Sequence, residues 1–421
     1  MAGISKPSLR ALAEVLKYPT MTQVQLQTLP VIIRHEDVLA KAKTGTGKTL
    51  GFLIPMVEVI LAARTRGVTR QGDVGALILS PTRELSNQIC REAEALLHFH
   101  KNVGVQAVIG GVNMKSQLRR MQNQRCDIMV ATPGRLIDHL NNSPGIRQRL
   151  ANIRCLCLDE CDQMLEMGFR PELTKIMNML PAAASTGRQN LLFSATVPKA
   201  VSDMAHTVLK SRAQFIDTVG EDDEQTHTHI EQESLEVSWQ NLVPTMMRVL
   251  KYHMTHPRFK VIVFFPTARF TQYMAAVATT MGLPVLEIHS RKSQSARSKA
   301  SAMFLKESNK ILFSSDVTAR GMDYPGVTFV LQVGLTDREQ YIHRLGRTAR
   351  AGAGGLGLLL LADNEVVLLK DLTDVSISPA GDVSKCTGGV AVVGHPKTDR
   401  CVAAVRTRVV GVCGVCGCKG V

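Results

Sequence analysis

The segment Ala42-Lys43-Thr44-Gly45-Thr46-Gly47-Lys48-Thr49 has the residue types and the spacing of a phosphate-binding loop. Its two glycines let backbone N–H groups approach phosphate oxygens, and the apolar helical pattern from Leu50 to Leu61 adds a helix N-terminus. In such a loop Lys48 reaches the β- and γ-phosphates, and the Thr49 hydroxyl ligates Mg²⁺. Gly-Lys-Thr also occurs in ordinary turns, and Ala42 stands where the general pattern has Gly. We expect the loop to bind a Mg²⁺-nucleotide, with ATP as the first candidate.

Two acidic residues, Asp159 and Glu160, follow directly after the apolar run from Cys155 to Leu158. Parallel sheets bind phosphates outside the carboxyl ends of their strands, which is where this pair is expected. Asp159 is suited to the Mg²⁺ shell, and Glu160 to orienting and deprotonating the water that attacks the γ-phosphate. Acids at a strand end are usually solvated turn residues, but a phosphate loop in the same chain favours the catalytic interpretation.

Three further loops that combine hydroxyls, glycines and arginines also follow apolar runs. Such groups at neighbouring strand ends contact a nucleic-acid backbone without distinguishing the bases. Turn chemistry explains each loop taken singly just as well. As a set they predict a nucleic-acid track formed by Pro81-Thr82-Arg83-Glu84-Leu85, Gly110-Gly111 and Thr132-Pro133-Gly134-Arg135.

The elements that must position these residues are short runs rich in β-branched residues, which alternate with longer helical patterns from Val38 to about Leu361. This alternation predicts an α/β protein in which helices cover parallel sheets, and the pattern occurs twice. The expected strands lie at 38–40, 76–79, 103–109, 128–131, 155–158 and 191–193, and then at 261–265, 285–288, 311–313, 329–333 and 358–361.

Changes in composition place the domain boundaries. The acidic run Glu221-Asp222-Asp223-Glu224 lies in a segment with few apolar residues, which is typical of a solvated linker. The periodic pattern ends at about Leu372. We therefore expect a first domain at 1–217, an acidic linker at 218–236, a second domain at 237–372 and a disordered Gly/Val/Cys-rich tail at 373–421.

Composition and charge narrow the class of protein. The chain has 421 residues, of which 45% are hydrophobic, and a formal net charge of +14. Two basic halves around an acidic connector suit a bound polyanion, and a generally basic surface is the alternative. No run approaches the 18 or so apolar residues of a membrane span, so a membrane role has no support. The five cysteines from Cys90 to Cys161 lack disulfide spacing and no signal-peptide pattern is present, which favours a reducing, intracellular compartment.

Taken in order, these motifs resemble those of the DEAD-box RNA helicases. That family has two tandem RecA-like domains, each a parallel sheet flanked by helices, of the P-loop NTPase class. The resemblance covers roughly residues 4 to 370. Tyr18, Thr22 and Gln25 resemble its adenine-reading element, in which Gln25 pairs with the base edge and Tyr18 stacks beside it. Asp159-Glu160-Cys161-Asp162 resembles its acidic motif, and Ser194-Ala195-Thr196 the element that couples hydrolysis to strand separation.

The second half resembles the rest of the series. The segment 289–297 resembles an RNA-contacting element, with Gln294 and Arg297 in its defining positions. The segment 315–323 resembles the next element. By that resemblance Thr318 faces RNA, Arg320 has a coupling role and Asp323 contacts the ATP ribose.

The segment 341–350 resembles the family's last element. The resemblance makes Arg347 and Arg350 the arginine fingers and gives His343 and Arg344 a coupling role. Arg344, Arg347 and Arg350 recur every three residues, so we expect them on one helical face, and a solvated basic face is the alternative. Arginines stabilise charge on a transferring γ-phosphoryl group, and supplying them from a second domain makes hydrolysis depend on closure.

The resemblance therefore implies an ATP-dependent RNA helicase. RNA stimulates hydrolysis of ATP to ADP and phosphate, which is coupled to local unwinding or remodelling of RNA duplexes, and the cofactors are ATP and Mg²⁺. A DNA-directed helicase is one alternative, against which Gln25 and the acidic motif argue. A non-catalytic RNA clamp or assembly platform is another. The implied catalytic residues are Lys48, Asp159, Glu160, Arg347 and Arg350.

The chain departs from the family pattern at several positions. Cys161 replaces the usual Ala, and Ala349 replaces a Gly between the two fingers, where its methyl group is expected to shift Arg350 slightly and to change the level of activity. The family's upstream aromatic residue has no counterpart before Ile4, which suggests that the N-terminus is incomplete and that an adenine contact and any targeting peptide are removed with it. The sequences flanking the motifs resemble an organellar plant and fungal group that acts on intron RNA, so a mitochondrion or chloroplast is expected, with cytoplasm or nucleus as alternatives. The tail cysteines at 413, 416 and 418 are spaced too tightly to predict a metal site.

Overall fold

The computed structural model describes residues 3–43, 45–219, 230–316, 322, 324–334, 337–348, 354–372 and 377–379, with only the backbone at 367, 368, 371, 378 and 379. The chain divides into two compact units, Met1–Glu224 and Gln225–Val421. Among the described helices, none has the length and the apolar character needed to cross a membrane.

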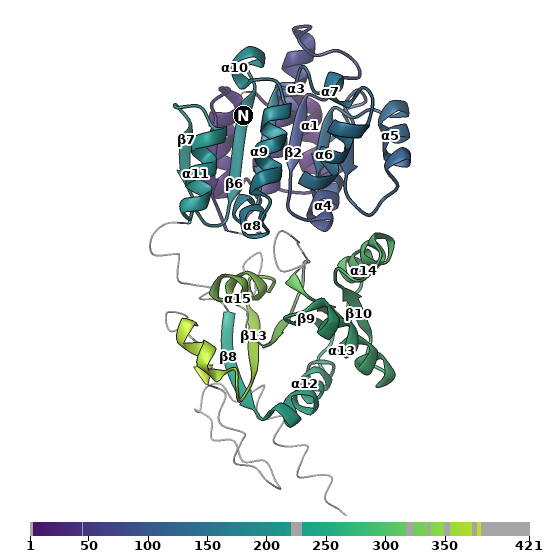
Figure 1. Ribbon diagram of the computed structural model, residues 1–421, viewed down its shortest axis with the longest axis vertical. Helices are drawn as coiled ribbons and strands as arrows, with labels where there is room; N and C mark the ends of the chain where they lie inside the picture. Colours follow the sequence, from purple (N-terminus) through teal and green to yellow (C-terminus); the bar gives the residue numbers. More distant parts are fainter. Residues whose placement is uncertain are drawn as a thin grey trace, which may run out of the picture. The chain divides into compact units, whose positions relative to one another are not determined.

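The first unit is built on a parallel sheet (Figure 1). Its described strands are β1 (Val38–Lys41), β2 (Ala76–Leu79), β3 (Val105–Val108), β4 (Ile128–Ala131), β5 (Cys155–Asp159), β6 (Gln189–Ser194) and β7 (Gln214–Asp217). They run in the order β3-β4-β2-β5-β6-β1-β7, and every pair is parallel. The central strands β2, β4, β5 and β6 are buried along their whole length, as expected for a parallel sheet covered on both faces.

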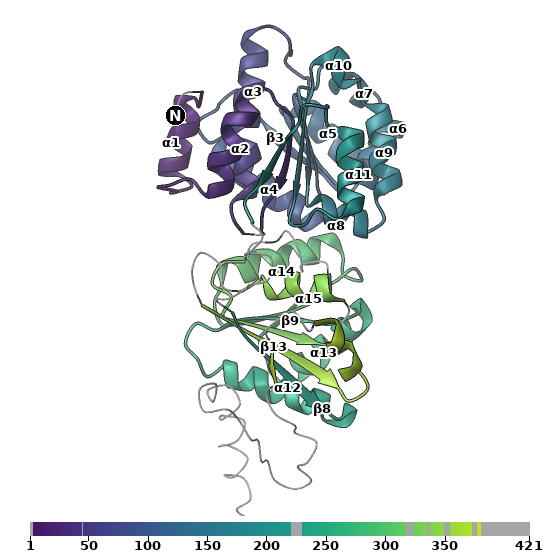
Figure 2. The ribbon, with the colours of Figure 1, turned by 90° about the vertical axis from the view of Figure 1, so that its left-hand side faces the viewer.

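Helices cover both faces of this sheet, as Figure 2 shows. One core cluster joins the sheet to α1 (Lys6–Glu14), α2 (Gln23–Ile33), α3 (Lys48–Thr65) and α4 (Arg83–Leu96). A second cluster joins the other face to α5 (Met114–Asn123), α6 (Pro133–Asn142), α7 (Ile146–Arg149), α8 (Cys161–Glu166), α9 (Arg170–Met179) and α11 (Lys199–Val208). The short helix α10 (Ala183–Thr186) precedes β6.

The second unit repeats the architecture. Its described strands are β8 (Ile230–Val237), β9 (Lys260–Phe264), β10 (Val285–Ile288), β11 (Lys310–Ser314), β12 (Phe329–Val333), β13 (Gly355–Ala362) and β14 (Ser378–Pro379). They form a parallel sheet in the order β10-β11-β9-β12-β13-β8-β14. Its helical elements are α12 (Trp239–His253), α13 (Ala268–Thr280), α14 (Gln294–Lys306), α15 (Arg338–Leu345) and the 3₁₀ segment η2 (Val366–Leu372).

Alternation along the strands of the second sheet explains how its helices are divided between the faces. In β9, Val261 and Val263 pack in a core cluster with α12 and α13, whereas Ile262 and Phe264 pack in a cluster with α14. Successive residues of a strand point to opposite faces, so one apolar run supports both layers. Tyr341 and Leu345 of α15 pack with residues of β8 and β13 in a third cluster.

The predicted α/β class with two parallel sheets is confirmed, and the strands expected at 76–79, 128–131, 285–288 and 329–333 have those bounds. The linker prediction at 218–236 was wrong at its C-terminal end. Residues 230–236 belong to β8, which pairs with β13 from Ile230↔Gly355 to Val237↔Ala362. The disorder predicted for 373–421 was wrong at Ser378–Pro379, which pairs with β8. The acidic run at 221–224 and the tail cysteines lie outside the described residues.

Candidate functional site

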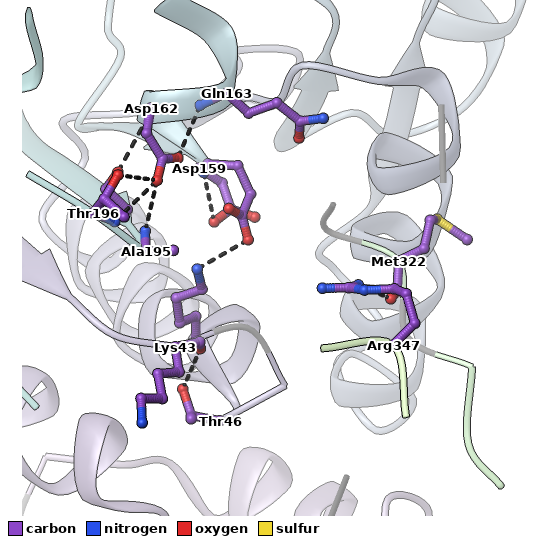
Figure 3. Close-up of polar contacts among 12 residues, drawn as sticks. Lys43, Thr46, Asp159, Asp162, Gln163, Ala195, Thr196, Met322 and Arg347 are labelled. Atoms are coloured by element: carbon purple, nitrogen blue, oxygen red, sulfur yellow. Dashed lines mark hydrogen bonds and ion pairs between the residues drawn. The ribbon is translucent and has the colours of Figure 1, made fainter. Parts of the chain in front are cut away.

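The phosphate-binding loop is shaped by two glycines in the left-handed region of backbone conformation. Gly45 has φ 79° and Gly47 has φ 87°, and Gly47 caps the N-terminus of α3. Thr46 Oγ1 donates to the Lys43 carbonyl at 2.8 Å inside the loop (Figure 3). At its start, the buried Ala42 donates its N–H to the Ser194 carbonyl at 3.0 Å. The loop therefore joins β1 to α3 as predicted. Thr44 lies outside the described residues.

The adenine-reading residue expected at position 25 is in direct contact with this loop. Gln25 is buried, and its Nε2 donates to the Gly47 carbonyl at 3.0 Å. Its Oε1 accepts from the Thr22 N–H at 3.0 Å, which completes a capping box at the start of α2. A Cβ added at Gly47 would lie 2.6 Å from Gln25 Nε2, so a larger residue would displace that amide, and φ 87° also favours glycine there. Tyr18, the predicted stacking partner of adenine, has a side chain that is 57% exposed.

Lys48 and Glu160 form a buried ion pair. Lys48 Nζ lies 2.9 Å from Glu160 Oε1, and the two side chains are only 6% and 3% exposed. Burial lowers the pKa of Lys48, but the carboxylates of Glu160, Asp159 and Asp162 raise it by more, so the ammonium stays charged. The structure therefore brings together the phosphate-binding lysine and the predicted catalytic acid, which are 112 residues apart.

Asp159 and Glu160 hold more negative charge than Lys48 neutralises. Burial, reinforced by the charge of Glu160, raises the pKa of Asp159 to about 7. Glu160 Oε2 is buried and has no hydrogen-bond partner among the described residues. Glu160 also adopts φ 52°, a conformation that costs a non-glycine residue energy and is concentrated at functional sites. An acidic site of this kind fits a divalent cation.

Thr49 and Asp159 remain the residues expected to hold that cation. Thr49 is half-buried in the first turn of α3, and Asp159 is the last residue of β5. The described residues contain no cluster of three His, Cys, Asp or Glu side chains able to hold a metal ion on their own. A cation here therefore depends on oxygens from the bound phosphates as well as on these two side chains.

Asp162 links the acidic motif to the segment Ser194-Ala195-Thr196 (Figure 3). Its Oδ2 accepts hydrogen bonds from the Ala195 N–H at 3.2 Å and from the N–H and hydroxyl of Thr196, both at 3.0 Å. Ser194 is fully buried, and its Oγ accepts from the Asp162 N–H at 3.2 Å. The two segments that follow β5 and β6 thus form one hydrogen-bonded unit. Sequence reasoning placed Asp162 in its motif but gave it no role.

Cys161, the departure from the family's Ala, is a core residue. Its side chain is fully buried in the cluster that also contains Met164 and Leu192. Burial raises the pKa of its thiol to about 12, so the group is an uncharged apolar side chain at neutral pH. Its position indicates packing rather than chemistry.

The sheet order separates the nucleotide loops from the predicted nucleic-acid loops. The phosphate loop, the acidic motif and the segment at 194–196 follow β1, β5 and β6, which are neighbours in the sheet. The loops beginning at Pro81, Gly110 and Thr132 follow β2, β3 and β4, which are neighbours in its other part. Because the strands are parallel, all six carboxyl ends lie at the same edge, so the two sites are adjacent.

The predicted nucleic-acid loops contact one another. Thr82 caps α4 by accepting from the Leu85 N–H at 3.2 Å. The Arg83 guanidinium packs on Gly110, where an added Cβ would lie 2.9 Å from its Nη2. Arg135 Nη1 donates to the Val112 carbonyl at 2.7 Å, which joins the loop after β4 to the loop after β3. Gly111 and Gly134 are exposed, as backbone approach by a ligand requires, and Pro81 and Thr132 are buried.

One residue of this network, Gln117 of α5, was missed by sequence reasoning. Its Nε2 donates to the Ile109 carbonyl at 2.9 Å, and its Oε1 accepts from Arg135 Nη1 at 2.8 Å. His139 Nε2 lies 3.1 Å from the same oxygen. A glutamine on the buried face of an otherwise polar helix is the signal that was available, since a buried amide needs partners.

In the second unit, the predicted RNA-contacting residues Gln294 and Arg297 lie in the first turn of α14, and both are buried. Ser293 caps that helix by accepting from the Ala296 N–H at 3.2 Å. The preceding loop is held by Glu287, which accepts from His289 Nε2 at 3.0 Å and pairs with Lys292. Thr318, Arg320 and Asp323 lie outside the described residues.

The expectation that Arg344, Arg347 and Arg350 share a helical face was wrong. α15 ends at Leu345, so Arg347 follows the helix, and Arg350 and Ala349 lie outside the described residues. The solvated alternative is wrong as well, because Arg344 and Arg347 are 0% and 1% exposed. Arg347 donates to the carbonyls of His343, at 3.1 Å, and Met322 (Figure 3). Arg344 pairs with Asp316, and His343 is buried.

Comparisons with known proteins agree with this arrangement. Residues 22–204 match the family model described as "DEAD/DEAH box helicase", and residues 243–352 match "Helicase conserved C-terminal domain". The chain is 48% identical over 401 residues to DEAD-box ATP-dependent RNA helicase 26 of Oryza sativa subsp. japonica, covering 94% of this chain and 73% of that protein. It is also 48% identical to helicase 25 of the same plant and 46% identical to helicase 31 of Arabidopsis thaliana, covering 63% and 52% of their lengths.

Solved structures give the same result. The structure of Mss116p lacking its NTE and C-tail, bound to ssRNA and AMP-PNP, matches with a TM-score of 0.82 and 32% identity over 89% of this chain and 77% of that one. S. cerevisiae Dbp5 bound to RNA and ADP BeF3 matches with a TM-score of 0.74 at 22% identity, which supports the fold alone. The matched models span both units and contain the loops described above. The chain belongs to the DEAD-box family of ATP-dependent RNA helicases.

Proposed function

We propose that this chain hydrolyses Mg²⁺-ATP in response to RNA and uses the cycle to separate or remodel short RNA duplexes. The observation that carries the proposal is the buried contact between Lys48 and Glu160, which unites a phosphate-binding lysine with a catalytic acid at one sheet edge. Two features support it. Gln25 contacts the phosphate loop, and the nucleic-acid loops lie on the neighbouring strands.

The chain's own residues supply the steps of hydrolysis. Backbone N–H groups of the loop at 42–49 and the ammonium of Lys48 hold the β- and γ-phosphates. When phosphates enter, they compete with Glu160 for the Lys48 ammonium, which frees the carboxylate. Glu160 then accepts a proton from the water that attacks the γ-phosphate. The ion pair with Lys48 thus keeps the Glu160 carboxylate from acting as a base until a nucleotide is bound.

We assign the Mg²⁺ of the nucleotide to Thr49 and Asp159. When bound, the ion withdraws charge from the phosphate oxygens and orients them for in-line attack. Asp159 is buried beside Glu160, whose Oε2 has no hydrogen-bond partner within the described part of the chain, so a divalent cation relieves an excess of negative charge there. Arg347 and Arg350 are assigned to the γ-phosphoryl charge, which makes hydrolysis depend on closure of the two units.

Coupling to RNA is assigned to Asp162. Its carboxylate holds the segment at 194–196, and that segment and the phosphate loop share the hydrogen bond from Ala42 N–H to the Ser194 carbonyl. These hydrogen bonds connect the acidic motif directly to the end of β6, so a movement of the motif also moves that segment. ATP and RNA that prefer the same arrangement of this unit raise each other's affinity. By thermodynamic linkage, the factor is the same in both directions.

The test is ATP hydrolysis with and without single-stranded RNA, comparing the unmodified chain with Lys48→Ala and Glu160→Gln. We expect strong stimulation by RNA in the unmodified chain and none in either variant. Glu160→Gln should still bind ATP and RNA together, since the amide keeps the size of the side chain. Arg248→Ala, an exposed residue of α12 outside the nucleotide site and the predicted RNA-contacting segments, serves as the control for folding and purification.

Two rival functions give different results in the same assay. A DNA-directed helicase predicts equal stimulation by DNA of the same sequence. A non-catalytic clamp predicts ATP-dependent RNA binding without hydrolysis in the unmodified chain. Gln25 at the phosphate loop and the complete Lys48–Glu160 pair favour the RNA-stimulated enzyme over both.

A further inference from the structure

The helix α5 carries a basic surface beside the nucleic-acid loops. The chain contains no Asp or Glu from residue 95 to residue 126, and α5 contributes Lys115, Arg119 and Arg120 to this stretch. The helix begins three residues after Gly111 and follows the edge strand β3 along the chain. In Figure 1 it lies at the margin of the first unit. RNA that leaves the predicted track past β3 therefore meets α5 first.

Only some of these basic side chains are engaged in contacts with the rest of the first unit. Arg120 donates to Gln106 Oε1 at 3.2 Å and to the Ala107 carbonyl at 2.9 Å, so it covers the edge strand β3. Arg125, just beyond the helix, donates to the Asn102 carbonyl at 3.0 Å. Lys115 and Arg119 are both exposed, and neither has an ion-pair or hydrogen-bond partner within the described part of the chain.

The position of these two residues is fixed by the opposite face of the helix. Gln117 and Met121 are buried, and Gln117 bonds both the Ile109 carbonyl and Arg135, as described above. The outer face with Lys115 and Arg119 is therefore rigidly tied to the loops at 110–111 and 132–135. The two side chains are four residues apart, so they lie on one face about 6 Å apart along the helix axis.

The surroundings do not neutralise this face. The acidic residue of the neighbouring helix α6, Asp138, is 3.6 Å from Arg135 of the same helix. The acid that follows the acid-free stretch, Asp127, is paired with Arg64 and accepts from the Gly104 N–H. Both nearby carboxylates thus have partners of their own. Two cations that lack partners among the described residues, on a helix held in place by Gln117, fit a polyanion, and phosphate contacts need no base recognition.

We propose that Lys115 and Arg119 form a second RNA-phosphate contact, which flanks the track of the loops at 81–83, 110–111 and 132–135. This contact holds an RNA segment outside the part that stimulates hydrolysis. The inference rests on the proposed function, since it extends the same RNA path. It predicts that α5 affects long or structured RNA more than the short single strand that saturates the track.

The test compares three RNAs by fluorescence anisotropy in the presence of a non-hydrolysable ATP analogue. The first is a short single strand that spans only the track of the loops at 81–83, 110–111 and 132–135, and the other two carry a duplex extension at one end or the other. The variants are Lys115→Glu/Arg119→Glu and the milder Lys115→Gln/Arg119→Gln. The matched control is Arg248→Glu/Lys251→Glu on α12, where both residues are exposed and lack partners among the described residues.

We expect Lys115→Glu/Arg119→Glu to weaken binding of one extended RNA about tenfold or more, and of the short strand by less than about twofold. The slope of log affinity against log salt should fall by about 1 to 2 for that extended RNA. The Gln variant should show the same pattern with a smaller loss. Unchanged affinity for both extended RNAs, an equal loss for the short strand, or an equal loss in the α12 control would overturn the proposal.

The proposed function is tested separately in the same samples. Without RNA-stimulated hydrolysis in the unmodified chain the proposed function fails, while the difference between extended and short RNA still decides the role of α5. If the unmodified chain binds none of the RNAs, both are overturned.

Discussion

Asp162 and Thr196 are joined by two hydrogen bonds to the same carboxylate oxygen, one from the Thr196 N–H and one from its hydroxyl, both 3.0 Å long. The Ala195 N–H donates a third bond to that oxygen. Three hydrogen bonds to one carboxylate oxygen therefore hold residues 195 and 196 to the acidic motif, and the strength of that attachment can be lowered stepwise.

Thr196→Val removes the hydroxyl bond and keeps the shape of the side chain and the backbone bonds. A hydrogen bond to a charged group contributes about 1.5–3 kcal/mol, which corresponds to a loss of about tenfold or more in a step that depends on it. We expect RNA-stimulated hydrolysis to stay within about threefold of normal and duplex unwinding to fall by at least tenfold. Thr207→Val, an exposed residue that bonds its own helix at the Asp203 carbonyl, is the control. A parallel fall in both activities would contradict the coupling role of Thr196.

Gln25→Ala should raise the KM for ATP by about tenfold or more and reduce the preference for ATP over GTP. The change removes the amide expected to pair with adenine and the bond from Nε2 to the Gly47 carbonyl. Buried amide partners left unpaired account for the size of the loss. Steady-state hydrolysis with each nucleotide measures the preference, and the exposed Gln27→Ala on the same helix is the control. An unchanged ratio of kcat/KM for ATP and GTP would show that Gln25 does not select the base.

Binding of Mg²⁺-ATP should weaken as the pH falls below about 7. Burial and the charge of Glu160 raise the pKa of Asp159 to about 7 in the nucleotide-free protein, so a proton competes with the cation below that pH. Because one proton is displaced, affinity should fall by up to about tenfold per pH unit below 7 and level off above it. Titration with a fluorescent ATP analogue between pH 5.5 and 8 measures this, and Asp159→Asn should bind weakly with little pH dependence. A flat profile in the unmodified chain would rule out this role of Asp159.

Arg347→Lys should lower kcat for RNA-stimulated hydrolysis by about a thousandfold with little change in RNA affinity. Lysine keeps the positive charge but cannot reproduce the planar guanidinium, which here also bonds the carbonyls of His343 and Met322. Since Arg347 is buried, thermal unfolding must be measured alongside to separate a catalytic from a structural loss. Arg269→Lys, exposed on α13, is the matched control. A folded Arg347→Lys protein with kcat within twofold of normal would remove the finger assignment.

Strands that consist of a continuous apolar run could be predicted from the sequence. Strands with continuous β-branched and aliphatic runs, such as Ala76–Leu79 and Ile128–Ala131, have the expected bounds because burial on both faces demands apolar residues throughout. β7 and β8 were missed because they lie near the sheet edges and carry too many polar residues for an apolar run, so Gln214–Asp217 and Ile230–Val237 resemble connecting segments. β8 also begins only six residues after the last acid of the run at 221–224, which concealed its start.

The candidate site was predictable wherever chemistry fixes both residue type and spacing. Glycines at 45 and 47, Lys48 and the acids at 159 and 160 follow from the geometry of phosphate binding. Contacts between distant segments were not predictable in the same way. No local pattern indicates that Asp162 bonds Thr196, that Gln25 touches Gly47 or that Gln117 joins two loops, because these bonds depend on strand order. The arginine series was misplaced because the three-residue period was extended beyond the helix end at Leu345.

The central claim is that RNA, and not DNA, activates ATP hydrolysis at the Lys48–Glu160 site. The most direct measurement is the rate of phosphate release by the unmodified chain at saturating Mg²⁺-ATP, with single-stranded RNA, with DNA of the same sequence and with no nucleic acid. We predict a rate with RNA at least about tenfold above the other two. Equal rates in all three conditions, or equal stimulation by DNA, would contradict the account.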